Sequence, residues 1–200
     1  TYVPQRARMR SLIPDGPLHQ REKVSTVVSS NRSKDIPELL SEREDVNVFQ
    51  TKPMETEIEV TGPILVNLWI SSNAIDTDFT AKLIDVYPPS KQYPEGFHLP
   101  LEDSICRARF REGYEKESFM KQGVVYEIQI ELPPVSNLFA IGHRIRLDIS
   151  SSNFPRFDIN PNTGEPIGRQ TRSQKANNSL FLDRDHPSHI VLPVVHAGKT

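Results

Sequence analysis

Hydrophobic and polar residues alternate along three stretches of the chain, residues 64–71, 124–131 and 144–150. In each stretch the residues at every second position are apolar. A period of two with one apolar face is typical of a β-strand that buries one side. All three stretches therefore favour antiparallel sheet. The apolar face of the first stretch consists of Ile64, Val66, Leu68 and Ile70.

Six shorter segments are further strand candidates, which brings the expected number of strands to about nine. Clusters of Pro, Gly, Asn and Asp separate them, and these residues favour turns. Long connections at 87–101 and 150–177 suit a jelly roll better than a meander. We therefore expect an all-β jelly-roll β-sandwich of about eight to nine main strands over 46–200. An extended lead-in, 1–45, precedes it, with one short helical turn near 35–41. The six candidates are 46–49, 57–60, 79–86, 105–111, 179–182 and 189–192.

The composition is ordinary for a globular chain, and at 200 residues one core is the economical interpretation. A formal net charge of −2 creates no field that would attract nucleic acid or an anionic membrane, so we expect neither partner. The single cysteine, Cys106, favours a reducing compartment such as the cytoplasm. The N-terminal sequence TYVPQRARMR has no apolar signal core, and we expect the chain to be a piece of a longer protein.

The stretch 150–166, SSSNFPRFDINPNTGEP, contains far more turn-forming residues than a connection between two strands needs. This density indicates a loop with a specified conformation. The sequence contains no Gly-x-Ser-x-Gly motif, and no nucleophile with a base lies close to this stretch. We therefore expect a structural corner or a docking loop here, without a cofactor.

Two pairs of residues have spacings that also occur in metal sites. Asp76 and Asp78 resemble the start of a calcium loop, but the glycine and distal glutamate of such a loop are absent. A turn in which the carboxylates bind backbone N–H groups is favoured instead. His186 and His189 are three residues apart, but Pro187 excludes a helix and no third ligand is near. We expect neither pair to bind a metal.

Three other features have both a structural and a functional interpretation. Cys106 has no nearby His or Asn, so it fits a small buried residue better than a nucleophile. Arg107, Arg109 and Arg111 share one face of a predicted strand, which indicates a solvated or salt-bridged face more than an anion site. Trp69 lies opposite the first apolar face, so it either packs in a second buried layer or contacts a partner.

Three long segments of the chain occur in a recognisable order: EVTGPILVNLWISSNAIDTDFTAKLIDVYP, SNLFAIGHRIRLDISSSNFPRFDINPNTGEP and HPSHIVLPVV. With the earlier GPLHQR, they resemble the C-terminal domain of the cocaine esterase and X-Pro dipeptidyl-peptidase family, the CocE/NonD-type serine hydrolases. The resemblance implies three parts: an α/β-hydrolase domain with a Ser-His-Asp triad, a helical cap, and a jelly roll of galactose-binding-like topology. This chain resembles the third part alone. It departs at His19, where that family usually has Asp, and along 23–44.

The resemblance implies a chain without catalytic residues, which supports the α/β-hydrolase domain of the same polypeptide and helps to wall its substrate cleft. That polypeptide would hydrolyse a small ester, amide or peptide substrate, including X-Pro dipeptides, and the 200 residues alone would be inactive. The residues expected to contact the hydrolase domain or its cleft are Leu12, Ile13, Trp69, Phe154, Arg156, Phe157 and Asp158.

Other interpretations of the same residues stay open. Phe154 and Phe157 could close the end of the sandwich, and Arg156 could form a local ion pair with Asp158. The sandwich could also be a carbohydrate-binding module, with sugars stacked on Tyr87, Tyr93 and Phe97. A third function is oligomerisation, for example as a homodimer.

Overall fold

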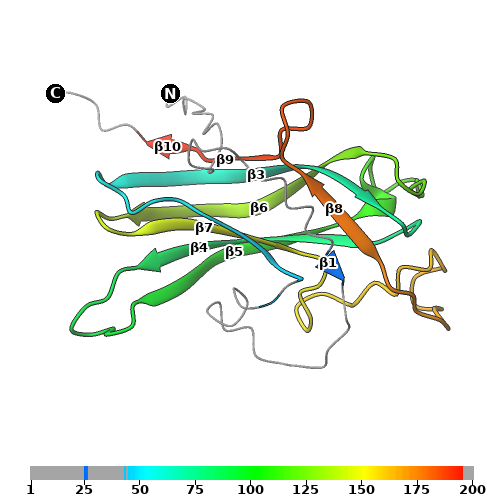
Figure 1. Ribbon diagram of the computed structural model, residues 1–200, viewed down its shortest axis with the longest axis horizontal. Coiled ribbons are helices and arrows are strands. Elements are labelled where there is room, and N and C mark those ends of the chain that lie inside the picture. The colour runs from blue at the N-terminus through cyan, green and yellow to red at the C-terminus, as the bar shows by residue number, and fades with distance from the viewer. Residues whose placement is uncertain (1–24, 27–42, 44, 196–200) are drawn as a thin grey trace.

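Two antiparallel β-sheets pack face to face and form a sandwich (Figure 1). The computed structural model describes residues 25–26, 43 and 45–195. Within these residues the regular structure is strand, apart from one turn of 3-10 helix, η1. The expected all-β sandwich is confirmed, whereas the jelly-roll connectivity stays a prediction. The elements are β1 (Ser25–Thr26), β2 (Asn47–Gln50), β3 (Ile58–Ser72), β4 (Asp78–Tyr87), β5 (Phe97–Arg107), η1 (Ala108–Phe110), β6 (Tyr126–Phe139), β7 (Arg144–Ser150), β8 (Asn177–Phe181), β9 (His189–Val191) and β10 (Val194–Val195).

The six-stranded sheet is built around β3, its longest strand. On one side β3 pairs with β6 along nearly its whole length. On the other side it pairs in turn with β10, β9 and β8. Strand β1, which lies within the predicted lead-in, pairs with β8 at the edge. One long strand therefore connects most of this sheet.

The four-stranded sheet has the order β2-β7-β4-β5. The core lies between the two sheets, because the apolar faces predicted from the alternation all point inward. Strand β3 contributes its alternate residues, which are almost completely buried. The inward-facing apolar residues of β4, β6 and β7 are also almost completely buried. This part of the core includes Ile64, Val66, Leu68, Ile70, Ile128, Ile130, Ala81, Leu83, Ile145 and Leu147.

Two predicted strands, 57–60 and 64–71, form a single strand in the structure. The pairing with β6 shifts register between Gly62 and Ile64, so the alternation is interrupted there. Gly62 has φ +135°, and a Cβ at this position would lie 3.2 Å from the Pro193 ring. The apolar pattern on each side of the irregularity therefore looks like a separate strand in the sequence.

The predicted long connection at 87–101 is wrong. Strand β5 already begins at Phe97, so β4 and β5 form a hairpin joined by residues 88–96. The strand also ends at Arg107 and continues as η1, whereas the sequence predicts a strand up to Arg111. The second long connection is confirmed, since residues 151–176 join β7 to β8. The predicted helical turn at 35–41 lies outside the described residues.

Strand β7 is buried on both faces, although its sequence predicts one buried side. Arg146 is 1% exposed, and its Nε and Nη2 donate to the two carboxylate oxygens of Asp148 at 2.7 and 2.8 Å. A bidentate pair of this kind satisfies the charges of both side chains. Polar residues in the alternation therefore do not mark a solvent-exposed face here.

Two leucines of β6 test the position of the core. Leu132 is fully buried and Leu138 is half exposed. We expect Leu132→Ala to lower the free energy of unfolding by about 2–5 kcal/mol, because truncation leaves a cavity. The matched control Leu138→Ala should change it by less than about 0.5 kcal/mol. Urea unfolding followed by Trp69 fluorescence measures both, and equal losses would contradict the described core.

Candidate functional site: the long loop and its buried ion pairs

The loop 151–176 lies at one end of the sandwich, on the right in Figure 1. The loop 73–77 between β3 and β4 and the link 108–125 between β5 and β6 reach the same end. The three segments lie at the same end because β3, β5 and β7 end there and β4, β6 and β8 begin there. The loop singled out in the sequence therefore belongs to a surface made by three connections.

Two buried carboxylates lie beneath this surface, those of Asp76 and Asp78, which are 0% and 1% exposed. Arg109 donates to Asp76 from its backbone N–H at 3.0 Å and from Nε at 2.8 Å. Arg107 donates to Asp78 from Nε at 2.9 Å and from Nη2 at 3.0 Å. Each carboxylate thus has its own guanidinium, and the oxygens considered for calcium bind N–H groups instead.

Asn160 of the long loop joins the two ion pairs. Its Nδ2 donates to Asp76 Oδ2 at 2.9 Å and to Asp78 Oδ1 at 2.8 Å. Its Oδ1 accepts the backbone N–H of Asn162 at 2.9 Å. A primary amide has two N–H donors, so one amide group serves both carboxylates. The long loop is therefore held to the β3–β4 turn and to the start of β4 by a single buried side chain.

Arg109 forms a second link between the same segments. Its side chain is 2% exposed, and Nη1 and Nη2 both donate to the carbonyl of Glu165 at 3.2 Å. Nη1 also donates to Glu117 at 3.0 Å. The predicted row of three arginines on one strand face is wrong, because the strand ends at Arg107. The salt-bridged alternative is confirmed for Arg107, Arg109 and Arg111, which pairs with Glu112 at 2.9 Å.

Further along the loop, the Glu165 carboxylate accepts hydrogen bonds from five groups. These are the hydroxyls of Thr163 and Thr171, the backbone N–H groups of Thr171 and Arg172, and Nε of Arg172, at 3.0–3.3 Å. Desolvation raises the pKa of this carboxyl, but the hydrogen bonds outweigh it and lower the pKa from 4.5 to about 2. The carboxylate form of Glu165 therefore organises the second half of the loop.

Cys106 lies next to this network on β5. Burial raises the pKa of its thiol to about 11, and the nearby charge of Asp78 contributes. Burial also raises the pKa of Asp78, against the hydrogen bonds from Arg107 and Asn160. A thiol with so high a pKa is a poor nucleophile. The interpretation of Cys106 as a structural residue agrees with its partly buried position among core residues.

Among the predicted contact residues Phe154, Arg156, Phe157 and Asp158, Arg156 contacts the four-stranded sheet at β5. Arg156 pairs through Nε with Asp103 of β5 at 2.6 Å, so the suggested ion pair with Asp158 is wrong. Asn153 donates to the other oxygen of Asp103 at 2.7 Å. The Arg156 guanidinium also lies 5.8 Å from the Phe157 ring centroid. Phe154 is 45% exposed and Asp158 is exposed, so both are accessible to a partner.

Trp69 lies on the other side of the sandwich. It alternates with the core residues Leu68 and Ile70, so its side chain is on the outer face of the six-stranded sheet. The indole packs edge-on against His186, with ring centroids 5.1 Å apart, and is half-buried. The structure therefore does not bring Trp69 together with residues 154–158. Leu12 and Ile13 lie outside the described residues.

The histidines of the HPSH motif make separate local contacts. His186 Nδ1 lies 3.1 Å from Asp183 Oδ1. His189 Nδ1 donates to the carbonyl of Pro187 at 2.8 Å, which leaves Nε2 to accept from Asn67 Nδ2 at 3.3 Å. Among the described residues no group of three His, Cys, Asp or Glu side chains could hold a metal ion. These contacts fit the structural interpretation of the motif.

The proposed sugar platform lies at the opposite end of the sandwich. Tyr93 stacks on Phe97 with ring centroids 4.9 Å apart, and Tyr87 contacts Phe97 edge-on at 5.9 Å. The other side of Tyr87 packs against His143 at 4.2 Å. The rings contact one another, but Tyr93 is still 38% exposed, so sugar binding at these rings stays a prediction.

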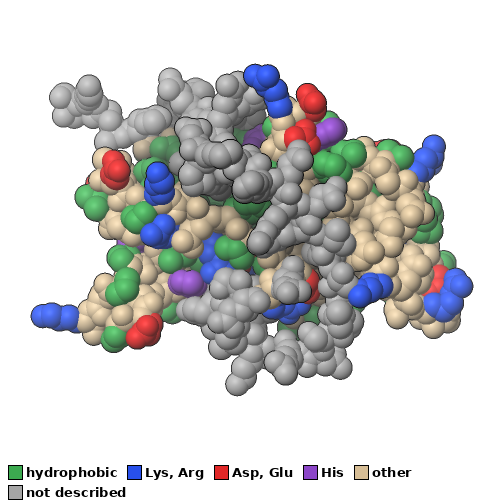
Figure 2. Space-filling view, in the orientation of Figure 1, with side chains coloured by type: hydrophobic (Ala, Val, Ile, Leu, Met, Phe, Trp, Pro, Cys, Tyr) green, Lys and Arg blue, Asp and Glu red, His purple; other side chains and the backbone are tan. Residues whose placement is uncertain are grey.

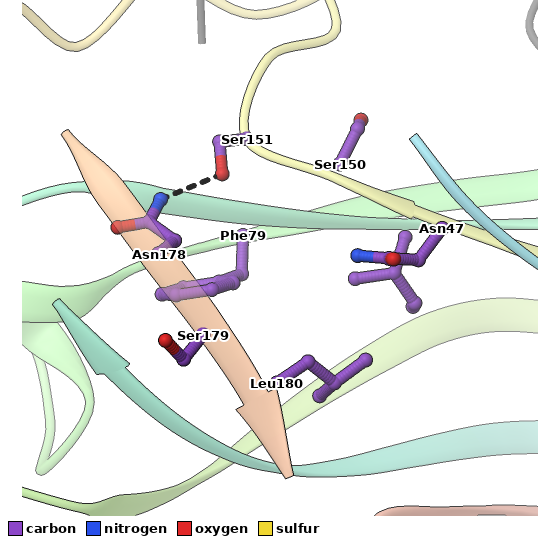
Figure 3. A pocket seen from close by; sticks show the side chains of 8 residues that line it. Asn47, Phe79, Ser150, Ser151, Asn178, Ser179 and Leu180 are labelled. Carbon is purple, nitrogen blue, oxygen red and sulfur yellow. Dashed lines mark hydrogen bonds between the residues drawn. The ribbon is translucent and has the colours of Figure 1, made fainter. Parts of the chain in front are cut away.

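A small pocket lies between β8 and the neighbouring ends of β2 and β7 (Figure 3). Asn178 of β8 donates to the Ser151 hydroxyl at 2.8 Å on one side of it. The enclosed space is close to that of one water molecule, so it suits no organic substrate. The residues around it include Asn47, Phe79, Ile149, Ser150 and Leu180.

Comparison with known proteins matches almost the whole chain to one family. Residues 5–191 match the family described as the X-Pro dipeptidyl-peptidase C-terminal non-catalytic domain. The chain is 41% identical over 158 residues to a cocaine esterase of Rhodococcus sp. (strain MB1 Bresler), covering 78% of this chain and 26% of that protein. It is 28% identical over 158 residues to a putative serine esterase of Mycobacterium bovis, covering 74% of this chain and 23% of the relative.

Two solved structures are similar in fold and sequence. An aminopeptidase from a marine sediment archaeon, Thaumarchaeota archaeon, has a TM-score of 0.76 and 30% identity, over 81% of this chain and 28% of its own. An α-amino acid ester hydrolase has a TM-score of 0.75 and 32% identity, over 80% of this chain and 27% of its own. The chain therefore spans about a quarter of the length of the relatives that it matches.

Replacement of Asn160 by leucine tests the bridging amide. The change removes two N–H donors from two buried carboxylates, and each lost hydrogen bond to a charged group costs about 1.5–3 kcal/mol. We expect Asn160→Leu to lower the free energy of unfolding by at least about 2 kcal/mol, measured in urea. The control Asn177→Leu, at an exposed asparagine, should change it by less than about 0.5 kcal/mol. Similar values for both variants would show that the bridge contributes nothing.

The low pKa of Glu165 predicts a pH-dependent contribution to stability. Because the pKa is lowered in the folded state, the contribution is fully present above pH 4.5 and is lost as the pH falls towards about 2. Wild type should be more stable than Glu165→Gln at pH 6, and the difference should shrink between pH 4.5 and 2. Urea unfolding at each pH measures the difference, and a constant difference across this range would contradict the assignment.

Proposed function

This chain belongs to the family of X-Pro dipeptidyl-peptidase C-terminal non-catalytic domains, and we propose that it is the non-catalytic part of a longer serine hydrolase. The observation that carries the proposal is the family match over residues 5–191 by a chain that spans about a quarter of its relatives. In this proposal the remaining part of the polypeptide is an α/β-hydrolase domain, and it supplies the nucleophile and its base. The 200 residues support that domain and form part of the wall of its cleft.

The polar groups of the candidate site support a structural role. Asp76, Asp78, Arg107 and Arg109 neutralise one another in two ion pairs, and Asn160 uses both its N–H groups between them. A catalytic acid or base needs an exchangeable proton within reach of a substrate. All five groups are paired, and all except Arg107 are buried, so they position loops rather than react.

The proposed reaction is hydrolysis of an ester or amide bond through an acyl-enzyme. The relatives' names include esterases, an aminopeptidase and an α-amino acid ester hydrolase, which share acyl transfer to water. A serine in the longer polypeptide would attack the carbonyl, the alcohol or amine would leave, and water would release the acid. The substrate would be a small ester, amide or peptide.

The proposed contacts with the hydrolase domain include the residues expected from the sequence. Phe154 offers an exposed ring, and the Arg156 side chain is 57% exposed although it is paired with Asp103. Phe157 and Asp158 lie beside them in the chain. Trp69 would contact the hydrolase domain only from the opposite face, so we propose it as a separate contact. Leu12 and Ile13 remain proposals from the sequence.

Activity measurements on two samples test the proposed function. The 200 residues alone should hydrolyse neither an aryl ester nor an X-Pro anilide above the rate in buffer. The longer polypeptide should hydrolyse at least one of them, and a serine-directed phosphonate should stop turnover by labelling a serine outside the 200 residues. Phosphonate-sensitive turnover by the 200 residues alone, or a longer polypeptide that the phosphonate does not label, would contradict the proposal.

A further inference from the structure

Exposed hydrophobic side chains are unevenly distributed over the described residues. Eleven large hydrophobic residues are at least 36% exposed, and seven of them belong to the three connections at the end of the sandwich that carries the long loop. Figure 2 shows hydrophobic side chains at the surface of this end, on the right. The seven are Ile75, Tyr114, Phe119, Val124, Phe154, Ile159 and Ile167.

The three connections meet at one point of this surface. A Cβ on Gly164 would lie 2.6 Å from Ile75 Cδ1 and 3.3 Å from Phe119 Cε1, so the backbone of the long loop packs directly on both side chains. Ile75 and Phe119 are nevertheless 44% and 41% exposed. Ile75, Phe119 and Gly164 therefore form one continuous apolar area, called here the loop-end surface.

The loop-end surface rests on the buried ion pairs. The Arg109 guanidinium lies 5.1 Å from the centroid of the Phe119 ring. The backbone N–H of Met120 donates to the carbonyl of Ile75 at 2.8 Å, and that of Ser118 donates to the carbonyl of Arg109 at 2.7 Å. The first bond connects the turn before β4 to the link after β5, and the second fixes the conformation of that link. The apolar area is therefore held in a fixed shape before any partner arrives, which lowers the entropic cost of binding.

We propose that the loop-end surface, centred on Ile75 and Phe119, is the docking surface for the catalytic part of the same polypeptide. This inference rests on the proposed function. A preformed exposed apolar area marks a protein contact, and about three quarters of the length of the matched relatives lies outside the region that this chain covers. The partner surface would be apolar, because Phe119 and Ile75 offer carbon atoms rather than hydrogen-bonding groups. Phe154, in the same long loop, would lie at the border of this contact.

Hydroxyl-radical footprinting of the 200 residues and of the longer polypeptide tests this surface. We expect Phe119 and Ile75 to be oxidised several-fold more slowly in the longer polypeptide. Leu138 and Ile141 are matched controls, because they are 50% and 67% exposed and lie outside the three connections. Their oxidation rates should be the same in both samples. Equal rates for Phe119 and Ile75 in the two samples would overturn the proposal.

A concentration series distinguishes the second possible occupant, another copy of the chain. If protection of Phe119 in the 200-residue sample increases with protein concentration to the level in the longer polypeptide, the surface is a self-association site and the proposal is wrong. Serine labelling of the longer polypeptide is measured on the same sample. Labelling without protection of Phe119 therefore rejects the docking surface alone, whereas the absence of labelling rejects the proposed function.

A pair of variants adds a readout of docking. In the longer polypeptide, Phe119→Ser should release the protection of Ile75, whereas Leu138→Ser should leave it unchanged. The circular dichroism spectra of both variants of the 200-residue chain show whether each still folds. If Phe119→Ser misfolds, the variant Phe119→Leu, which keeps an apolar side chain, replaces it. Phe119→Leu should retain the protection of Ile75. Full protection of Ile75 in a folded Phe119→Ser variant would contradict the proposal.

Discussion

The Asn160 amide joins the segments at the end of the domain that carries the long loop. Asn160 donates to Asp76 and to Asp78, and each of these carboxylates also binds an arginine. Two carboxylates this close repel each other unless donors lie between and around them. The guanidinium groups supply charge, and the amide supplies the two donors that bring the long loop into the same buried group. The positions of the three connections depend on this arrangement, because each of them contributes at least one of its members.

The sandwich places these groups where they can meet. Strand β3 leads into the turn with Asp76, and β4 begins with Asp78 and pairs with β5, which ends at Arg107. Antiparallel pairing sets Asp78 directly opposite Arg107, so the first ion pair follows from the register. Arg109 reaches Asp76 because the chain leaves the sheet at η1 and turns inward. Burial of this pair is weak evidence for stability.

Much of the fold could be predicted from the sequence, because alternation reports which side of a strand is buried. The apolar faces of β3, β6 and β7 were visible in this way, and so was the long connection after β7. The prediction failed where something other than the alternation of apolar residues decides the structure. The register shift at Gly62 divided one strand into two, and the Arg146–Asp148 pair buried a face that looked polar. The hairpin between β4 and β5 was missed because its proline-rich sequence resembles a loop.

The candidate site was harder to predict than the fold. The sequence shows Asp76 and Asp78 as a pair and Arg107, Arg109 and Arg111 as a row, but which of these side chains bind each other depends on register and on the early end of β5. Asn160 gives no separate signal in the sequence, since an asparagine before a proline is typical of an ordinary turn. The central claim is that the loop end is preformed, and hydrogen exchange tests it most directly. The amide protons of Asn162 and Arg109 bind Asn160 Oδ1 and Asp76 Oδ1, so they should exchange as slowly as amides in the centre of β3. Exchange at the rate of an unstructured loop would contradict this account.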